Sequence, residues 1–392
     1  MERSRRSLAI VLGATVVTLG LGFALKAPCL GPWDGRQYTH LCYSDIVPLF
    51  FTEGLDRELV PYLEAPNEYP VLTGLTQSFA GIPADSPSSF FVWNALLLTA
   101  FALVTAAVLH RLAGLRALDF AAAPTLLISG FVNWDLLAVT LATLGTWAFL
   151  RSRDGPAGVA LGLGAAAKLY PGFLLAPFAL DRLRARRWSG AALLAGAGAL
   201  TWAAVNLPFA LAAPGRWSLF FTFNAERPVD WDSLWHVTQR HLGWPASIPV
   251  ANALSAIAFV ALAALLWWAA ERARPGFPAW TFGFPLLVAF LLTAKVYSPQ
   301  FSLWLLPWFA LTLPSLPLFA AFSAAEVAVF VTRFRFFAEM DGLPGGVPFW
   351  AFEAALLVRA AVLVAALALW VRGARRPEEA RAPVPAPEEA PL

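Results

Sequence analysis

The segment Leu161–Leu180, LGLGAAAKLYPGFLLAPFAL, is apolar throughout except for one lysine, Lys168, near its centre. A charged residue at the centre of a membrane segment costs about 2.5–3.5 kcal/mol on insertion scales. The chain contains only three lysines, so this position is an unusual use of a rare residue. Arg153 precedes the segment and Arg182 follows it, and arginines on both sides favour the same, cytoplasmic side of a membrane.

The stretch between these arginines is too short to cross a bilayer twice, because each crossing takes about 20 residues. It predicts a re-entrant hairpin over 157–180, in which two half-length helices meet near mid-membrane and turn at 168–171. Irregular backbone at that depth is tolerated only where it is buried in protein or lines a wet cavity. We therefore expect Lys168 to point into a cavity that is open to the outside.

The composition of the whole chain indicates a membrane protein. Hydrophobic residues make up 59% of the 392 residues and charged residues only 14%, whereas ordinary globular domains are about half apolar and a quarter charged. Apolar runs recur from end to end without the alternation typical of a β-barrel, and no soluble basic domain suggests nucleic-acid binding. We predict an all-α polytopic bundle of about 11–12 transmembrane segments, including the hairpin.

The expected organisation is one transmembrane domain over residues 1–371, with a disordered cytoplasmic tail over 372–392. Its main extracytoplasmic loops are 26–88 and 212–248, which we expect to be helical in part. Besides the hairpin, the expected spans are 8–25, 90–109, 117–131, 134–150, 189–211, 249–270, 279–294, 299–314, 317–332 and 349–371.

The arginine clusters between the spans predict the topology. With both termini placed in the cytoplasm of a plasma-membrane protein, 17 of the 28 lysine and arginine residues fall on the inner side, as the positive-inside rule requires. The unusual polar residues then gather on the outer side. Basic and acidic groups that converge on one face of a helical bundle indicate a site for an anionic substrate with acid/base chemistry.

The candidate residues on this outer face also have structural interpretations, which the sequence leaves open. Asp45 can be simply solvated, and either Asp135 or Asn133 can cap the helix that follows. Arg227 can belong to a surface ion-pair cluster with neighbouring acids, and Lys295 can reach toward the membrane interface.

Three further features concern structure more than chemistry. Cys29 and Cys42, the only cysteines, both fall in the first outer loop, where a disulfide can form. Glu326, Glu353 and Arg359 lie inside the last two spans, and we expect them to pair with one another. Two cysteines without a histidine pair do not make a zinc site, so no metal site and no cofactor are predicted, although Asp34 with Asp45 could bind a divalent metal.

Three motifs together resemble glycosyltransferase family 87, whose members are membrane mannosyltransferases of the GT-C fold. The first loop has Asp45-Ile46, Pro61-Tyr62 and Tyr69-Pro70 in order; Gly164-Ala-Ala-Ala-Lys168-Leu-Tyr170-Pro171 follows, and then Ser298-Pro299-Gln300-Phe301. The resemblance covers about residues 30–310. It implies transfer of a sugar, mannose, from a polyprenyl-phosphate carrier to a lipid or glycan acceptor at the outer face of the plasma membrane.

The resemblance also implies that an acidic residue in the first outer loop acts as the base. Asp45 matches that position, although the family often has tyrosine where this chain has Phe50 or Phe51. Asp34 lies closer to the first span and remains an alternative base. The Cys42-Tyr43-Ser44-Asp45 form is typical of a divergent subgroup of an actinobacterial family.

Chemistry considered without the family leads to the same reaction. Nucleotide sugars are made in the cytoplasm, so a donor used at an outer site must be carried on a lipid, and its leaving group is a polyprenyl phosphate. Cations fixed in a low-dielectric cavity stabilise the charge that grows on such a group. We predict Lys168, assisted by Arg227 or Lys295, as the donor-phosphate ligands, and Asp45 as the base of an inverting transfer. The predicted substrate-binding residues are Tyr62, Tyr69, Asn133, Asp135, Tyr170, Tyr297 and Gln300.

Two other functional classes remain open from the sequence. Broken helices and charges at mid-membrane also mark secondary transporters and flippases of anionic or lipid-linked substrates, although no internal repeat is visible. A non-catalytic scaffold for envelope assembly is the other alternative. Replacing Asp45 and Lys168 separates them, because a transferase needs both, a transporter mainly the lysine, and a scaffold neither.

Overall fold

The computed structural model describes residues 2–31, 33–243, 247–313 and 315–373. The regular elements of this described part are α-helices and 3-10 turns, without a strand, and they pack into one bundle. This confirms the predicted all-α polytopic membrane fold. Six described stretches are long and apolar enough to cross a membrane: Ser4–Cys29, Pro87–Ala121, Trp188–Ala212, Ile248–Ala273, Leu316–Met340 and Phe349–Arg372. Their long helices are α1 (Glu2–Lys26), α5 (Pro87–Ala113), α12 (Trp188–Ala212), α16 (Ile248–Ala273), α19 (Leu316–Met340) and α20 (Phe349–Arg372).

Shorter helices fill the bundle and its loops. Within the bundle they are α6 (Leu118–Ala121), α7 (Pro124–Ser129), α8 (Asp135–Leu150), α9 (Asp154–Ala167), α10 (Tyr170–Phe173), α11 (Leu175–Arg184), α17 (Gly283–Thr293) and α18 (Leu306–Thr312). In the loops they are α2 (Arg36–Thr39), α3 (Ile46–Thr52), α4 (Val71–Gly81), α13 (Pro214–Trp217), α14 (Leu219–Glu226) and α15 (Leu234–Leu242). The 3-10 turns are η1 (Ala27–Cys29), η2 (Leu55–Arg57), η3 (Gly114–Ala117), η4 (Ala279–Phe282) and η5 (Pro299–Leu305).

Three of the predicted spans are not continuous α-helices, and one of them, 279–294, is the 3-10 turn η4 followed by α17. The span expected over 117–131 is divided into η3, α6 and α7, because Pro124 follows Ala123, whose ψ of 128° is extended; a residue before proline disfavours helical geometry. The span expected over 299–314 is the 3-10 turn η5 followed by α18. In contrast, α19 continues to Met340, beyond the predicted end at 332, and the predicted tail lies outside the described residues from 374 onward.

The predicted re-entrant hairpin is present. Helix α9 ends at Ala167, the following Lys168 is extended with a φ of −158° and a ψ of 137°, and the chain returns through α10 and α11. The two ends of the hairpin meet, since Arg182 Nε at the end of α11 donates to Asp154 Oδ1 at the start of α9 over 2.6 Å. Gly164 allows the arms to pack closely, because a Cβ there would lie 2.7 Å from Pro171 Cβ.

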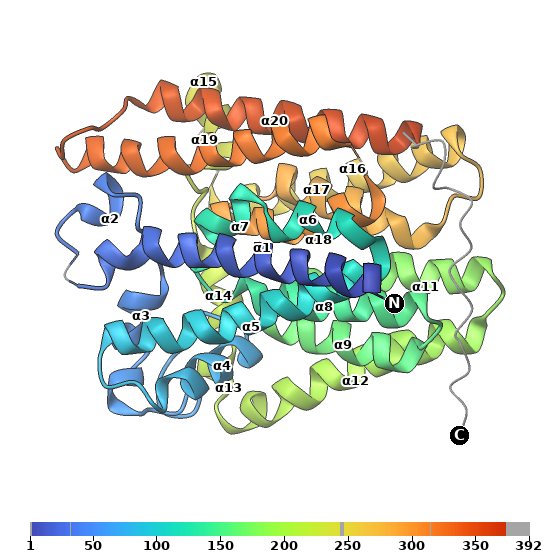
Figure 1. The fold of residues 1–392 in the computed structure, drawn as a ribbon, viewed down its shortest axis with the longest axis horizontal. Helices are drawn as coiled ribbons and strands as arrows, with labels where there is room; N and C mark the ends of the chain where they lie inside the picture. The colour runs from blue at the N-terminus through green and yellow to red at the C-terminus, as the bar shows by residue number, and fades with distance from the viewer. Residues whose placement is uncertain (1, 32, 244–246, 314, 374–392) are drawn as a thin grey trace.

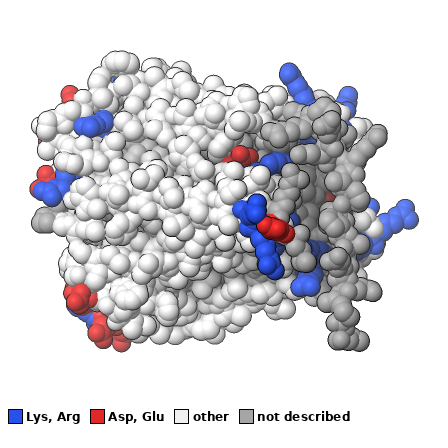
Figure 2. All heavy atoms as spheres, viewed as in Figure 1, with Lys and Arg blue, Asp and Glu red and all other residues white. Residues whose placement is uncertain are grey.

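The molecule has two chemically different ends. In Figure 1, α1, α5, α19 and α20 run along its long axis, and α2, α3 and α4 lie at one end, which we call the loop end. Arginine contacts hold the opposite, arginine-rich end together, for example Arg184 with Glu271 at 2.7 Å and Arg274 with the Val371 carbonyl at 3.1 Å. Figure 2 shows an uncharged belt between charged side chains at the two ends, as expected for a protein embedded in a bilayer.

The loop that follows α1 is fastened to the bundle at the loop end. A disulfide joins Cys29, just after α1, to Cys42, in agreement with the predicted pairing. The buried Lys26 Nζ donates to the Tyr43 carbonyl over 2.7 Å. Ser44 Oγ donates to the Phe131 carbonyl over 2.7 Å, and the Asp45 backbone N–H donates to the Val132 carbonyl over 2.8 Å. These contacts fix the position from which the Asp45 side chain projects.

Candidate active site

A cavity of about 640 Å³ lies inside the loop end. Segments far apart in the sequence line it: the loop between α1 and α4, the tip of the 154–184 hairpin, α14, the junction between α17 and η5, and α19. Its wall combines charged groups with many aromatic rings, including Phe220, Phe221, Phe290, Phe301 and Trp304. Such a cavity suits a ligand that has both an apolar portion and an anionic or polar portion.

The Asp45 carboxylate is one of the charged groups that line this cavity. It accepts a hydrogen bond from the Tyr43 hydroxyl at 2.7 Å and a longer one from the Tyr69 hydroxyl at 3.3 Å. Burial raises the pKa of the Asp45 carboxyl, while the Tyr43 hydroxyl and the charge of Lys168 oppose that shift. A positioned carboxylate with a raised pKa is suited to accept a proton from a hydroxyl group.

Lys168 lies at the tip of the hairpin and faces the cavity, as predicted. Its Nζ forms an ion pair with Asp135 Oδ1 at 2.8 Å, and it lies 4.8 Å from the centre of the Phe301 ring. The lysine side chain is 16% exposed, whereas that of Asp135 is 1% exposed. The lysine therefore keeps donors available toward the cavity while the deeper carboxylate balances its charge.

Asp135 occupies the first position of α8 and does not line the cavity. Asn133 Oδ1 accepts a hydrogen bond from the Asp135 backbone N–H at 3.1 Å, so Asn133 closes the start of the helix. The position of Asp135 therefore favours a role in holding Lys168 over direct contact with a substrate.

Further cations line the cavity. The Lys295 Nζ donates to the Arg227 carbonyl at 2.6 Å and to the Ala225 carbonyl at 3.2 Å, and burial, assisted by the charge of Arg227, lowers the pKa of Lys295. The Arg227 guanidinium donates to Asp230 Oδ2 at 2.5 Å. Arg333 of α19 also lines the cavity. These groups make the cavity attractive to an anion.

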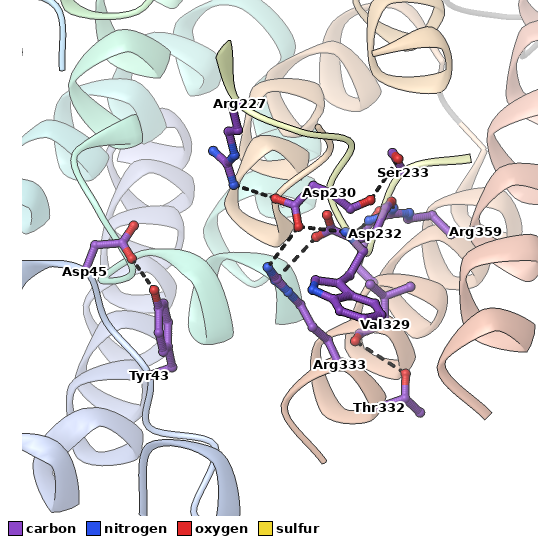
Figure 3. A network of polar contacts seen from close by, with 12 residues as sticks. Tyr43, Asp45, Arg227, Asp230, Asp232, Ser233, Val329, Thr332, Arg333 and Arg359 are labelled. Atoms are coloured by element: carbon purple, nitrogen blue, oxygen red, sulfur yellow. Dashed lines mark hydrogen bonds and ion pairs between the residues drawn. The ribbon is translucent and has the colours of Figure 1, made fainter. Parts of the chain in front are cut away.

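A network of buried charges lies beside the cavity (Figure 3). Arg333 lies 3.7 Å from Asp230 Oδ1 and 3.6 Å from Asp232 Oδ2, and Arg359 donates to the Asp232 carbonyl at 2.7 Å. Arg359 is also 3.9 Å from Glu326, which is one of the expected pairs. Glu353 instead pairs with His241 of α15, so the expectation that it would join that cluster is wrong.

The predicted site residues divide into two groups. Eight of them line the cavity: Asp45, Tyr69, Asn133, Lys168, Tyr170, Arg227, Lys295 and Gln300. Asp34, Tyr62, Asp135 and Tyr297 do not. Asp34 forms an exposed ion pair with Arg36 at 2.7 Å, and a hydrogen bond from Arg36 lowers its pKa.

The two tyrosines outside the cavity have internal partners. The Tyr62 hydroxyl donates to the Tyr69 and Pro70 carbonyls at 2.9 and 2.8 Å. The Tyr297 hydroxyl lies 2.9 Å from Ser302 Oγ, and its ring lies 3.6 Å from the Arg359 guanidinium. Both tyrosines therefore stabilise the walls of the cavity from behind.

Sequence reasoning did not select Tyr43 or Arg333 as site residues. Tyr43 stands two positions before Asp45, and this adjacency was the available signal. Arg333 was placed beyond the end of a span that was expected to stop at 332, whereas α19 continues to Met340. Within the described residues no group of three or more histidine, cysteine, aspartate or glutamate side chains could hold a metal ion.

An integral membrane protein with a buried carboxylate and several cations in one aromatic cavity is suited to act on an anionic, lipid-linked substrate. The sequence matches Glycosyltransferase family 87 over residues 69–299, more than half of the 392-residue chain. The protein belongs to this family and is a glycosyltransferase. Lys168, Arg227 and Lys295 lie inside the matched region, whereas Asp45 precedes it and Arg333 follows it. No curated protein matches the sequence.

Solved structures with a similar arrangement are distant from this chain. ArnT from Cupriavidus metallidurans bound to undecaprenyl phosphate has 14% sequence identity and a TM-score of 0.46, over 93% of this chain and 78% of ArnT. The apo state of ArnT from the same organism has 14% sequence identity and a TM-score of 0.44, over 92% of this chain and 78% of ArnT. The oligosaccharyltransferase from Archaeoglobus fulgidus has 13% sequence identity and a TM-score of 0.42, over 95% of this chain but only 56% of the oligosaccharyltransferase. The chain thus spans little more than half of that archaeal enzyme.

Proposed function

We propose that this glycosyltransferase moves mannose from a polyprenyl-phosphate carrier to a hydroxyl group of a lipid or glycan acceptor, with inversion at the anomeric carbon. The observation that carries the proposal is that one aromatic cavity contains both the Asp45 carboxylate and the cations Lys168, Arg227 and Lys295. Mannose is the sugar that the resemblance to the family implies.

The proposed donor matches the two kinds of surface in the cavity. During transfer, the bond between the anomeric carbon and the phosphate oxygen breaks, and negative charge grows on the departing polyprenyl phosphate. Lys168, Arg227 and Lys295 stabilise that charge in a partly buried site. Phenylalanine rings from α14 and α17 offer apolar surface for the first isoprene units, and Tyr170, which stacks on Trp304 at 4.3 Å, completes an aromatic wall.

Asp45 is the proposed base. As the acceptor oxygen attacks the anomeric carbon from the side opposite the phosphate, its proton passes to the Asp45 carboxylate, and the new glycosidic bond replaces the bond to phosphate. The hydroxyls of Tyr43 and Tyr69 hold the carboxylate in one orientation. Asp34 is the weaker candidate, because its carboxylate is exposed and paired with Arg36.

The cavity is proposed to open to the outside of the plasma membrane. It lies at the loop end, opposite the arginine-rich end that the positive-inside rule places in the cytoplasm. Nucleotide sugars do not reach that side, which supports a lipid-linked donor.

A glycosyl-transfer assay tests this proposal. Purified protein is incubated with radiolabelled decaprenyl-phosphate mannose and a membrane-lipid extract, and the wild type is compared with Asp45→Asn. We expect the substitution to reduce transfer by about 100- to 10,000-fold, the usual contribution of a general base. Equal amounts of folded protein, measured by size-exclusion chromatography, establish that the loss is chemical.

The variant Asp34→Asn decides between the two candidate bases. If Asp34→Asn abolishes transfer and Asp45→Asn retains it, the base is Asp34. A wild type that transfers label from the corresponding arabinose lipid but not from the mannose lipid would contradict the proposed sugar while preserving the reaction class.

A further inference from the structure

Arg333 differs from three other arginines, Arg182, Arg227 and Arg359, in how few short hydrogen bonds its guanidinium donates. Arg182, Arg227 and Arg359 each donate a hydrogen bond of 2.7 Å or shorter. The carboxylate oxygens nearest Arg333 lie at 3.6 and 3.7 Å. These distances exceed the donor–acceptor distance of about 2.7–3.2 Å that is usual for an N–H···O hydrogen bond. Its Nε is buried without a hydrogen-bond partner among the described residues.

The Arg333 side chain is part of the cavity wall. Arg333 lines the cavity together with Phe330 and Phe334, which lie on the same face of α19. The Phe337 ring lies 4.8 Å from the guanidinium carbon and supports it from behind. An arginine carries five N–H donors in a fixed fork, and this geometry matches a phosphate group. The side chain is therefore held in place by packing and long-range charge, with its hydrogen bonds still to be made.

The position of Arg333 relative to the proposed reaction is also informative. Its charge acts on both Tyr43 and Asp45, and Figure 3 shows it between the 227–233 segment and the Tyr43–Asp45 pair. Asp230 is shared by Arg227 and Arg333. Asp232 lies near Arg333 as well, so the two carboxylates balance the charge of the two arginines, and the feature that Arg333 offers an anionic group is its unmade hydrogen bonds.

We propose that Arg333 binds the phosphate group of the polyprenyl donor through its guanidinium fork, while Asp230 and Asp232 only hold the arginine in position. This inference rests on the proposed function, because it adds a ligand to the same donor site. It assigns to α19 a direct role in donor binding.

Binding of decaprenyl phosphate without a sugar tests the inference separately from catalysis. The full-length protein is purified in detergent, and the dissociation constant for radiolabelled decaprenyl phosphate is measured for the wild type, Arg333→Gln and Arg333→Lys. We expect Arg333→Gln to weaken binding about tenfold or more, since hydrogen bonds to charged groups contribute about 1.5–3 kcal/mol. Arg333→Lys keeps the charge but loses the fork, so we expect an intermediate affinity.

Two further variants distinguish a ligand from a structural arginine. Arg335→Gln removes a nearby arginine of α19 that donates only a 3.4 Å hydrogen bond to the Gly345 carbonyl, and we expect wild-type affinity. Asp232→Asn weakens the fastening of Arg333 without removing its donors, and we expect it to retain binding. Thermal unfolding of each variant is measured in parallel.

The outcomes separate this inference from the proposed function. If the wild type binds decaprenyl phosphate and Arg333→Gln binds it equally well, Arg333 is not a ligand, but the proposed donor stands. The inference is also overturned if Arg335→Gln weakens binding as much as Arg333→Gln, because the loss would then follow from the positive charge of α19 in general and not from the guanidinium of Arg333. A wild type that does not bind decaprenyl phosphate contradicts the proposed donor itself and this inference with it.

Discussion

The carboxylate of Asp45 is held by two tyrosine hydroxyls at different distances. Tyr43 approaches to 2.7 Å and Tyr69 to 3.3 Å. Both bonds stabilise the ionised form, and they oppose the effect of burial, which raises the pKa of Asp45. The proposed base is active only when it is ionised, so transfer should increase as the pH rises through this pKa.

The variant Tyr43→Phe should move the acidic limb of the pH–rate profile to higher pH. Removing the shorter hydrogen bond makes the carboxylate less stable relative to the carboxyl, so the pKa of Asp45 rises further. The measurement is kcat/KM against pH for the wild type, Tyr43→Phe and Tyr69→Phe. Tyr69→Phe should shift the acidic limb less, because the hydrogen bond from Tyr69 is longer. A shift of the acidic limb to lower pH in either variant would exclude Asp45 as the titrating base.

Some individual site residues could be identified from the sequence because they break a strong local pattern. Lys168 stands out in an apolar segment, and the structure places it on the cavity wall. In contrast, Tyr62 was expected to contact substrate, but its hydroxyl is used by two backbone carbonyls within the first loop. The direction in which a loop tyrosine points depends on tertiary contacts, which a single sequence does not contain.

At the level of elements, the hairpin shows how close packing places a charged residue inside the bundle. Helix α9 has 14 residues and α11 has 10, which correspond to about 21 and 15 Å of helix. Neither length spans a hydrocarbon core of about 30 Å. Gly164 lets the returning chain approach α9 at Pro171, directly beside the turn that carries Lys168.

The variant Gly164→Ala should therefore destabilise the hairpin. A Cβ 2.7 Å from Pro171 Cβ forces the arms apart, and overpacking of this kind costs about 1–3 kcal/mol. We expect a lower melting temperature in detergent and weaker transfer, because Lys168 moves with the turn. Gly196→Ala in α12 is the matched control, since nothing lies within 4 Å of the added Cβ, and it should not lower the melting temperature. Equal behaviour of the two variants would show that close packing at Gly164 is unimportant.

The elements that sequence reasoning misjudged have identifiable causes. The interruption of the 117–131 span follows from Pro124, a local signal that the apolar composition outweighed. The span over 317–332 was predicted to end too early, because Arg333 and Arg335 were interpreted as residues outside the membrane. In the structure Asp230 and Asp232, from a loop about 100 residues earlier, balance the charge of Arg333, and such long-range compensation cannot be predicted from the helix itself.

For the whole molecule, the charge distribution predicts which end faces the outside. The uncharged belt separates the loop end from the arginine-rich end, and the positive-inside rule assigns the arginines to the cytoplasm.

The long apolar runs were sufficient to predict a polytopic bundle, because the bilayer dictates their length and polarity. How the loops meet to form the cavity was not predictable, since it depends on contacts between segments far apart in the sequence.

Single cysteines introduced at exposed positions test this orientation. The two native cysteines are joined in a disulfide, so a new thiol is the only free one. Thr52→Cys lies at the loop end, and Arg111→Cys lies near the other end of α5, where His110 contacts Ser7 at 2.8 Å. We expect a membrane-impermeant maleimide to label the first in intact cells and the second only after permeabilisation. The reverse pattern would place the cavity on the cytoplasmic side and contradict the lipid-linked donor.

The disulfide between Cys29 and Cys42 has a consequence for how the enzyme matures. Disulfides form and persist in oxidising compartments and are rare in the cytosol. In the proposed topology, the loop that carries Asp45 can be tied to the end of α1 only after that loop has crossed the membrane. A chain whose loop has not yet crossed the membrane would then lack this fastening of the loop that carries Asp45. In this topology, reduction of the disulfide would loosen the loop that carries Asp45 without removing the protein from the membrane.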